Sequence, residues 1–210
     1  VEVERPAPSY FTKVFGIDSV DVNARATARA GVPSGAQYAA PIAVDEDHPM
    51  LQCRCFGEET ELSLVNLHDP GGSDGAGAFS LIDLDSIYSN GNVGSSTLGE
   101  WIREGYDGAL PLGTYRSAPG ADFNSGHVKS ALNARLGDEL LFPVYRTLVQ
   151  GGSEAQYEVV AWVGFVPTSF SGGGSRGTIR GHFTQVIWQG IADETGDVPD
   201  FGVRVISLVE

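Results

Sequence analysis

Apolar and polar residues alternate along much of the chain, and a period of two predicts β-strands with one buried face. Between residues 20 and 30, Val20, Val22 and an alanine at each later even position alternate with polar residues. Further on, β-branched and aromatic residues predict strands over 61–67, 79–84, 140–149, 157–165, 178–187 and 201–209. Glycine-rich or acidic turns separate the last four, so we expect an antiparallel meander or sandwich.

Three short segments have helical rather than strand spacing. Leu98, Trp101 and Ile102 share one helical face. A second segment, 125–136, has apolar residues four positions apart, and a third begins after Ser9. The predicted fold class is therefore α+β and β-rich, an antiparallel sandwich or meander with two or three short helices.

The pattern divides the chain near residue 31. Residues 1–31 are predicted to form a strand, a helical turn and a strand, and residues 32–210 a β-rich domain packed on them; one single domain is the alternative. The sequence starts inside the alternating run Val1-Glu-Val-Glu. We interpret this run as a strand already under way, and so expect a processed or truncated product.

Acidic residues outnumber basic ones by 27 to 13, which gives a formal net charge of −14 over 210 residues. Such a chain is not expected to bind nucleic acid or an anionic lipid surface, because both need a basic stripe. Its 41% apolar content suffices for a packed core. The sequence shows neither a long apolar run typical of a membrane span nor a signal-peptide pattern. Ten acids and a single base, Arg54, fall between residues 45 and 85, which indicates a solvated face or a cation site.

Four of these acids flank a glycine-rich stretch and could offer oxygen ligands to calcium: Asp69, Asp74, Asp83 and Asp85. Their spacing matches neither an EF-hand loop nor a nonapeptide calcium repeat. The alternative is that the carboxylates only keep a surface loop soluble. We expect no cofactor, with calcium as the one candidate.

Cys53 and Cys55 lie between His48 and His68 in the order H-x4-C-x-C-x12-H. Structural zinc sites usually have two or more residues between paired cysteines, so the single spacer is unfavourable for zinc. On a strand, cysteines two apart share a face, with their Cα atoms near the upper limit for a disulfide. The alternatives are a disulfide, if the protein is extracellular, two free thiols, or zinc.

Two segments, 71–75 and 173–177, fit the nucleophile motif G-x-S-x-G. A nucleophile elbow needs a strand before the serine and a helix after it, and because neither segment has that context we interpret both as hairpin loops. Glu100 and Glu104 lie one turn apart, as on a solvated helix face, and the three tryptophans are interpreted as core or edge anchors. Nothing in the sequence combines a nucleophile, a base and an oxyanion site, so we predict that the chain is not an enzyme.

The segment 181–188, GHFTQVIW, resembles the signature of the CAP family of secreted proteins, whose histidine belongs to a surface cleft that can bind metal. The resemblance implies an α–β–α sandwich in which His182 faces a second histidine and a carboxylate. It covers these eight residues only. The upstream helix with His and Glu, and the Cys-rich strand with an Asn-Tyr ending, are not found in the expected order. The other interpretation is a plain strand that carries His182.

A second resemblance extends over nearly the whole chain. Residues Val3–Gly16 have the sequence VERPAPSYFTKVFG, and Val20–Ala28 the sequence VDVNARATA. Together with the later segments 40–42, 77–83, 98–105, 119–120, 141–144, 157–165 and 200–206, they resemble the soluble region of TadE/TadG-like proteins, minor pilin-like components of the Flp (tight adherence) pilus machinery. The N-terminal transmembrane helix and the Ala-rich helix of that family are not present in this chain.

This resemblance implies a non-enzymatic, surface-exposed structural or interaction domain of a pilus-assembly or pilus-associated protein. Its partners would be other pilin-like or secretion-machinery subunits, docked by strand addition or through an apolar patch. It would be extracellular or on the cell surface, anchored by a transmembrane helix preceding this chain. The alternatives are a CAP-like secreted domain with a His182 cleft and a calcium-binding adhesin module.

Overall fold

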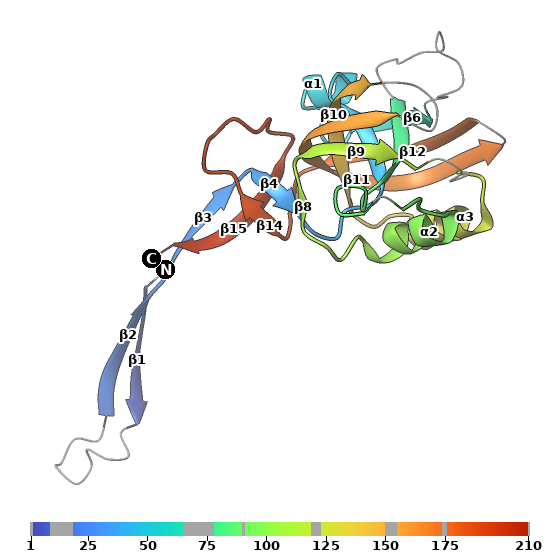
Figure 1. The fold of residues 1–210 in the computed structure, drawn as a ribbon. Coiled ribbons are helices and arrows are strands. Elements are labelled where there is room, and N and C mark those ends of the chain that lie inside the picture. The colour runs from blue at the N-terminus through green and yellow to red at the C-terminus, as the bar shows by residue number, and fades with distance from the viewer. Residues whose placement is uncertain are drawn as a thin grey trace.

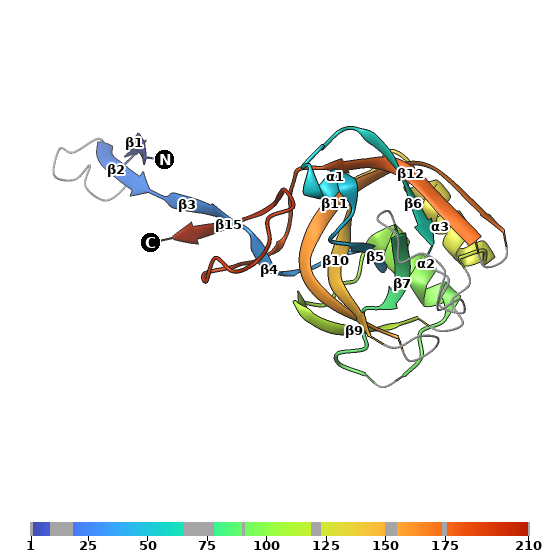
Figure 2. The ribbon, with the colours of Figure 1, turned by 90° about the horizontal axis from the view of Figure 1, so that it is seen from above.

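A closed β-barrel forms the body of the molecule. The structure, a computed structural model, describes residues 2–8, 19–64, 78–89, 91–118, 123–149, 155–173 and 176–209. Five strands close the ring, each paired with the next: β5 (Ile42–Asp45), β7 (Ala78–Asp83), β9 (Gly113–Ser117), β11 (Gln156–Gly173) and β10 (Leu140–Val149), which returns to β5. Figure 2 shows β10 and β11 curving around one side of the ring.

Two further strands continue the barrel wall beyond the end of β9, which pairs with only part of β7 and part of β11. Residues 78–79 of β7 pair with β6 (Glu59–Leu64), whereas 82–83 pair with β9. The long β11 likewise pairs with β9 over 156–159 and with β12 (Arg176–Thr184) over 164–173. Because β6 and β12 also pair with each other, they cover the edges of β7 and β11 that β9 does not reach.

The prediction of a β-rich α+β fold is confirmed, but the predicted sandwich or meander is wrong. Two pairs in the barrel, β5 with β10 and β6 with β7, are parallel, and a meander contains only antiparallel neighbours. Register shifts in the β10–β11 pairing, at 144–145 and 145–147, bend the two strands enough to close a ring. Alternation predicts strands but not their partners, so the closure had no signal in the sequence.

The part of the chain that the structure describes contains three short helices: α1 (Pro49–Gln52), α2 (Ser95–Glu104) and α3 (Gly126–Ala134). The Ser125 hydroxyl caps α3 by accepting a hydrogen bond from the Val128 N–H at 3.2 Å. Helices α2 and α3 pack on each other, on the side of the barrel opposite the curved β10 and β11 (Figure 2). The helical turn predicted after Ser9 lies outside the described residues. Among those residues, no helix has the length and apolar character that a membrane span requires.

Apolar side chains fill both faces of the central strands. Along β10, Leu141 belongs to one buried cluster, with Trp162, Tyr115 and Tyr157, and the adjacent Phe142 belongs to another, with residues of α2 and α3. A strand buried on both faces has a continuous apolar run rather than an alternating one. This explains the sequence LLFPVY at 140–145.

A ribbon of paired strands extends from the barrel (Figure 1). We call it the arm: β3 (Thr27–Gly31) paired with β15 (Val203–Val209), and beyond them β1 (Glu2–Pro8) paired with β2 (Ser19–Arg25). Two small sheets join it to the barrel: β13 (Val186–Ile187) pairs with β15, and β14 (Gly190–Ala192), β4 (Pro33–Ala36) and β8 (Leu110–Pro111) form the second. The arm therefore combines the first residues of the chain with the last, across the predicted boundary at residue 31.

Candidate functional site

The most elaborate polar cluster of the described residues lies where β7 ends. Asp83, the last residue of β7, accepts a hydrogen bond from the Asp85 N–H at 3.1 Å. The Ser86 hydroxyl donates to the Asp83 carbonyl at 2.6 Å. Short polar side chains that bond the backbone in this way offer the chain an alternative to the sheet ladder. The sequence Asp-Leu-Asp-Ser thus ends the strand and turns the chain outward.

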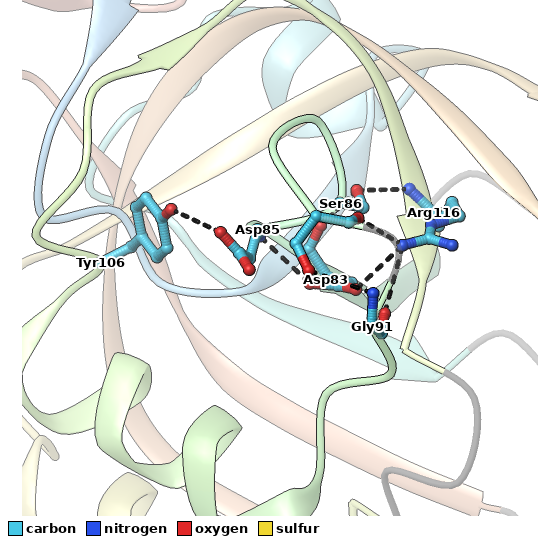
Figure 3. Close-up of polar contacts among 7 residues, drawn as sticks. Asp83, Asp85, Ser86, Gly91, Tyr106 and Arg116 are labelled. Atoms are coloured by element: carbon cyan, nitrogen blue, oxygen red, sulfur yellow. Dashed lines mark hydrogen bonds and ion pairs between the residues drawn. The ribbon is translucent and has the colours of Figure 1, made fainter.

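Arg116 of β9 holds this turn against the barrel (Figure 3). Its backbone N–H donates to the Ser86 hydroxyl at 3.0 Å. One guanidinium nitrogen, Nη2, donates to the carbonyls of Ser89 and Gly91 at 2.8 and 3.2 Å, and lies 3.8 Å from Oδ2 of Asp83. The guanidinium therefore supplies the positive charge beside Asp83.

Burial controls the titration of the cluster. Asp83 is only 4% exposed, and burial raises its pKa, against the opposing effects of the Asp85 N–H and of Arg116. Tyr106 donates to Oδ1 of Asp85 at 3.1 Å. Burial and this hydrogen bond to Asp85 raise the pKa of Tyr106 to about 12. The tyrosine accordingly stays a hydrogen-bond donor across the physiological pH range.

A small hollow of about 170 Å³ opens beside the cluster, lined by Asp83, Asp85, Ser89, Gly91, Asn92, Val93, Thr97 and Trp101. The Trp101 ring stands edge-on to Tyr106, with 5.1 Å between the ring centroids. The walls thus combine two carboxylates, two hydroxyls, an amide and one aromatic ring. Within the described residues, this set has no nucleophile beside a base, so the arrangement is that of a braced loop with a polar hollow.

The calcium candidates are only partly placed. Asp83 and Asp85 come together at this turn, while Asp69 and Asp74 lie outside the described residues. Calcium takes six to eight oxygen ligands, and no group of three or more His, Cys, Asp or Glu side chains that could hold a metal occurs in the described ranges. Beside Asp83, the Arg116 guanidinium provides the counter-charge that a cation would otherwise supply.

The structure places a disulfide between Cys53 and Cys55, with an S–S distance of 2.06 Å. The thiolates needed for zinc are therefore not available. His48 caps helix α1: its Nδ1 accepts a hydrogen bond from the Met50 N–H at 3.1 Å, and burial lowers its pKa. His68, the other predicted zinc ligand, lies outside the described residues.

His182 lies on β12, where its neighbours in the sheet are Val166 of β11 and Glu59 of β6. It is half-buried, and the β11–β12 ladder has a register shift between Pro167 and Ser169, opposite the preceding residues of β12. The closed barrel also differs from the α–β–α sandwich that the CAP resemblance implies. The structure thus places His182 on a plain strand.

The other residues that the sequence singled out lie on the surface of a helix, in the core or at the edge of a sheet. Glu100 and Glu104 are exposed on α2. Trp162 is buried in the core, and the Trp188 indole N–H donates to the Gln37 carbonyl at 2.7 Å. Of the two G-x-S-x-G segments, 71–75 lies outside the described residues, as do the central residues 174–175 of the other.

Sequence reasoning missed Arg116 and Tyr106. Arg116 is one polar residue of an ordinary alternating strand, GTYRS, and nothing marks it as the partner of a turn thirty residues earlier. The Asp-x-Asp-Ser order at 83–86 was the available signal, because it is typical of a side-chain-stabilised turn.

A second hollow, of about 460 Å³, lies between the β14–β4–β8 sheet and the turn that follows β7. Its apolar walls include Tyr88, Leu110, Pro111 and Ile191, and two amides, of Gln37 and Gln189, lie among its lining residues. The Tyr88 hydroxyl donates to the Ala109 carbonyl. No Asp, Glu, His, Lys or Arg of the described residues lines this hollow. Its walls therefore provide apolar surface and a few hydrogen-bonding groups, and the Tyr88 phenol is the one titratable group among them.

No protein-family model, no curated protein and no solved structure matches the chain.

Proposed function

We propose that this chain is a non-enzymatic, surface-exposed structural and interaction domain of a pilus-assembly or pilus-associated, minor pilin-like protein. The observation that carries the proposal is the arm. Its strands β1, β2 and β3 cover most of residues 1–31, which bear the clearest part of the resemblance to TadE/TadG-like proteins. The segment most similar to a pilus component is thus the one that projects from the barrel.

The arm has the form expected of a docking element. Strand β3 is the edge strand of the sheet β13–β15–β3, and an edge strand presents backbone N–H and C=O groups on which a partner strand can be added. The barrel strands, in contrast, are paired around a closed ring. Partners such as pilin-like or secretion-machinery subunits would therefore add to the arm rather than to the barrel.

The cysteines support an extracellular or cell-surface location. Disulfides persist in oxidising compartments and are rare where glutathione keeps thiols reduced. Cys53, one half of the disulfide, is exposed, and an exposed disulfide would be open to reductants in the cytosol.

Two adjacent proline substitutions on β3 test strand addition. Successive N–H groups of a strand point to opposite edges, so Arg29→Pro and Ala30→Pro each remove a donor from a different edge. The substitution facing β15 breaks a ladder hydrogen bond and lowers the Tm, whereas the other leaves the Tm unchanged and blocks an added strand.

The readout is co-purification of pilin-like subunits with the tagged protein from cells that assemble a tight-adherence pilus. The proline that spares the Tm should reduce the co-purified amount about fivefold, the effect of one lost backbone hydrogen bond. Equal recovery with both variants, or no pilin-like subunit with the wild type, would contradict the proposal.

A further inference from the structure

The disulfide between Cys53 and Cys55 closes a very short loop. The two cysteines are two positions apart in the sequence, with Arg54 alone between them. A disulfide stabilises a fold mainly by restricting the unfolded chain, and this contribution grows with the length of the loop that it closes. A bond across a single intervening residue therefore adds little to the stability of the barrel, and its presence calls for another explanation.

Hydrogen bonds and packing hold this segment in place on both sides of the disulfide. Upstream, the Cys53 N–H donates to the Pro49 carbonyl at 2.9 Å, and Leu51 is 1% exposed. Downstream, the Gly57 N–H donates to the Phe183 carbonyl of β12 at 2.8 Å. The segment is thus anchored without the sulfur–sulfur bond, so the two cysteines stay near each other when that bond opens.

The backbone between the cysteines has a conformation that arginine rarely adopts. Arg54 follows the end of α1 with a φ of 54°, in the left-handed region, where a Cβ is disfavoured and glycine is the usual residue. The closed ring holds it there: the Cα atoms of Cys53 and Cys55 are 5.3 Å apart, whereas an extended chain separates alternate residues by about 6.6 Å. Opening the disulfide frees Arg54 from this conformation, which favours reduction.

The disulfide is accessible and lies beside a positive charge. Cys53 and Arg54 are exposed, and Cys55 is half-buried. Arg54 is the single Arg or Lys between residues 45 and 85, and its charge extends to Asp200, whose pKa it helps to lower. A cation beside a disulfide stabilises the thiolates that enter and leave during exchange. Cys53, as the more exposed cysteine, is the one that an incoming thiolate reaches first.

We propose that the Cys53–Cys55 disulfide is a thiol–disulfide exchange site, which oxidises a partner that carries two neighbouring thiols. A thiolate of the partner attacks Sγ of Cys53 and forms a mixed disulfide, while the Cys55 sulfur leaves as a thiolate and takes up a proton. The partner's second thiolate then attacks the partner's own sulfur in the mixed disulfide, and the Cys53 sulfur leaves and is protonated. Two electrons and two protons have then passed from the partner, now a disulfide, to the cysteine pair, now two thiols.

Equilibration of the purified chain with mixtures of reduced and oxidised glutathione tests the proposal. The chain contains only these two cysteines, so alkylation of free thiols followed by mass spectrometry counts the opened bonds directly. Structural disulfides resist the glutathione pool, whereas strained or exposed ones are labile. We expect the equilibrium constant for reduction to exceed that of a structural disulfide at least about 1,000-fold, which corresponds to about 90 mV for a two-electron couple.

The fold of the reduced protein is the second readout. Because the bond closes so short a loop, the reduced chain should keep the far-UV circular dichroism spectrum of the oxidised one, with a Tm within about 5 °C. The double variant Cys53→Ser/Cys55→Ser, which cannot form the bond, should show the same Tm as the reduced wild type. Reoxidation should restore the disulfide, since the segment stays anchored at both ends.

Substitutions of Arg54 separate the backbone conformation from the charge. Arg54→Gly and Arg54→Ala both remove the guanidinium, but glycine adopts the left-handed conformation without a steric cost. The equilibrium constant for reduction should therefore be about fivefold lower in Arg54→Gly than in Arg54→Ala. Arg54→Lys keeps the charge, so it should react with glutathione as fast as the wild type, whereas Arg54→Ala should react about threefold more slowly.

Three outcomes would overturn the proposal: a disulfide that stays closed wherever structural disulfides do, a barrel that unfolds on reduction, or equal reduction constants in Arg54→Gly and Arg54→Ala. The experiment uses no pilus component. Disulfide exchange and the proposed pilus function are therefore tested separately.

Discussion

Single residues fix the turns that the barrel needs. Asp83 shows the balance at one of them: its carboxylate is buried, which costs free energy and raises its pKa, yet it accepts the Asp85 N–H that closes the turn. Arg116 offsets part of this cost through its charge and through two hydrogen bonds to loop carbonyls. The cluster therefore positions a loop, and its unusual titration does not by itself indicate chemistry.

A different carboxylate stabilises the start of β15. Asp200 accepts two hydrogen bonds from Arg204, each at 2.7 Å, and a third from the Gly202 N–H at 3.0 Å. The hydrogen bond from Arg204 is the largest cause that lowers the pKa of Asp200 to about 2. Because its pKa in the unfolded chain is near 3.8, the folded state binds this proton less tightly than the unfolded state does.

We predict that Asp200→Asn lowers the free energy of unfolding by about 1 kcal/mol at neutral pH, a discounted value because the pair is partly exposed. The stabilisation by Asp200 is present above about pH 4 and is lost as the pH falls toward 2. The difference between wild type and variant should therefore shrink over that range, measured by urea denaturation at a series of pH values. A difference that stays constant down to pH 2 would contradict this role.

At the scale of elements, the contact between α2 and α3 depends on the absence of a side chain. A Cβ added at Gly99, in the middle of α2, would lie 2.9 Å from the backbone oxygen of His127. Glycine is a poor helix former, so its presence there is explained by the close approach of α3 rather than by helix propensity.

We predict that Gly99→Ala destabilises the protein by about 1 to 3 kcal/mol, because the two helices must separate. Propensity alone predicts the opposite, a gain of about 1 kcal/mol. Ser96→Ala on the exposed side of the same helix is the matched control and should be neutral or slightly stabilising. Thermal unfolding of both variants distinguishes the two effects, and a stabilised Gly99→Ala would show that α2 does not press on α3 here.

Elements were predicted from the sequence more successfully than their arrangement. The strands expected at 79–84 and 140–149 and the helix around Trp101 are present, because one local period specifies each. The predicted strand over 20–30 is divided at Ala26 into β2 and β3. Between the strands predicted at 20–30 and 61–67, the chain also contains β4, β5 and α1, which the pattern did not predict because elements of four residues are too brief to show a period.

The same limit applies to the candidate site. Asp83 and Asp85 could be singled out because they stand in an acidic stretch. Their partners Arg116 and Tyr106 are brought to them by the pairing of β7 with β9 and by the bridge between Ala39 and Tyr106. Such pairings join residues distant in the sequence, and no local pattern encodes them.

At the scale of the whole molecule, the barrel and the outer half of the arm are energetically separate. Strands β1 and β2 pack on each other and make no extensive contact with the barrel, whereas Val203 and Val205 of β15 are each 1% exposed. The two ends of the chain should thus contribute unequally to stability.

We predict that removing residues 1–25 leaves the Tm of the barrel unchanged. Removing residues 203–210 should instead lower the stability by more than about 3 kcal/mol, because two buried valines are lost from the core together with a strand. Differential scanning calorimetry of both truncated chains checks this, with far-UV circular dichroism to verify the fold. An equal loss from both truncations would show that the outer hairpin supports the barrel.

The antiparallel ladder of the arm also determines how the molecule responds to tension. Thr27 pairs with Val209 and Gly31 with Val205, so residues 27 and 209 lie side by side at the end of the ladder away from the barrel. A force that pulls these two residues apart loads one pair at a time, and the strands separate in sequence like a zipper. The barrel bears no load until the fifth pair has opened, by which point the molecule has lengthened by about 30 Å. Under such a load the ladder would act as an extensible link that yields before the folded body does.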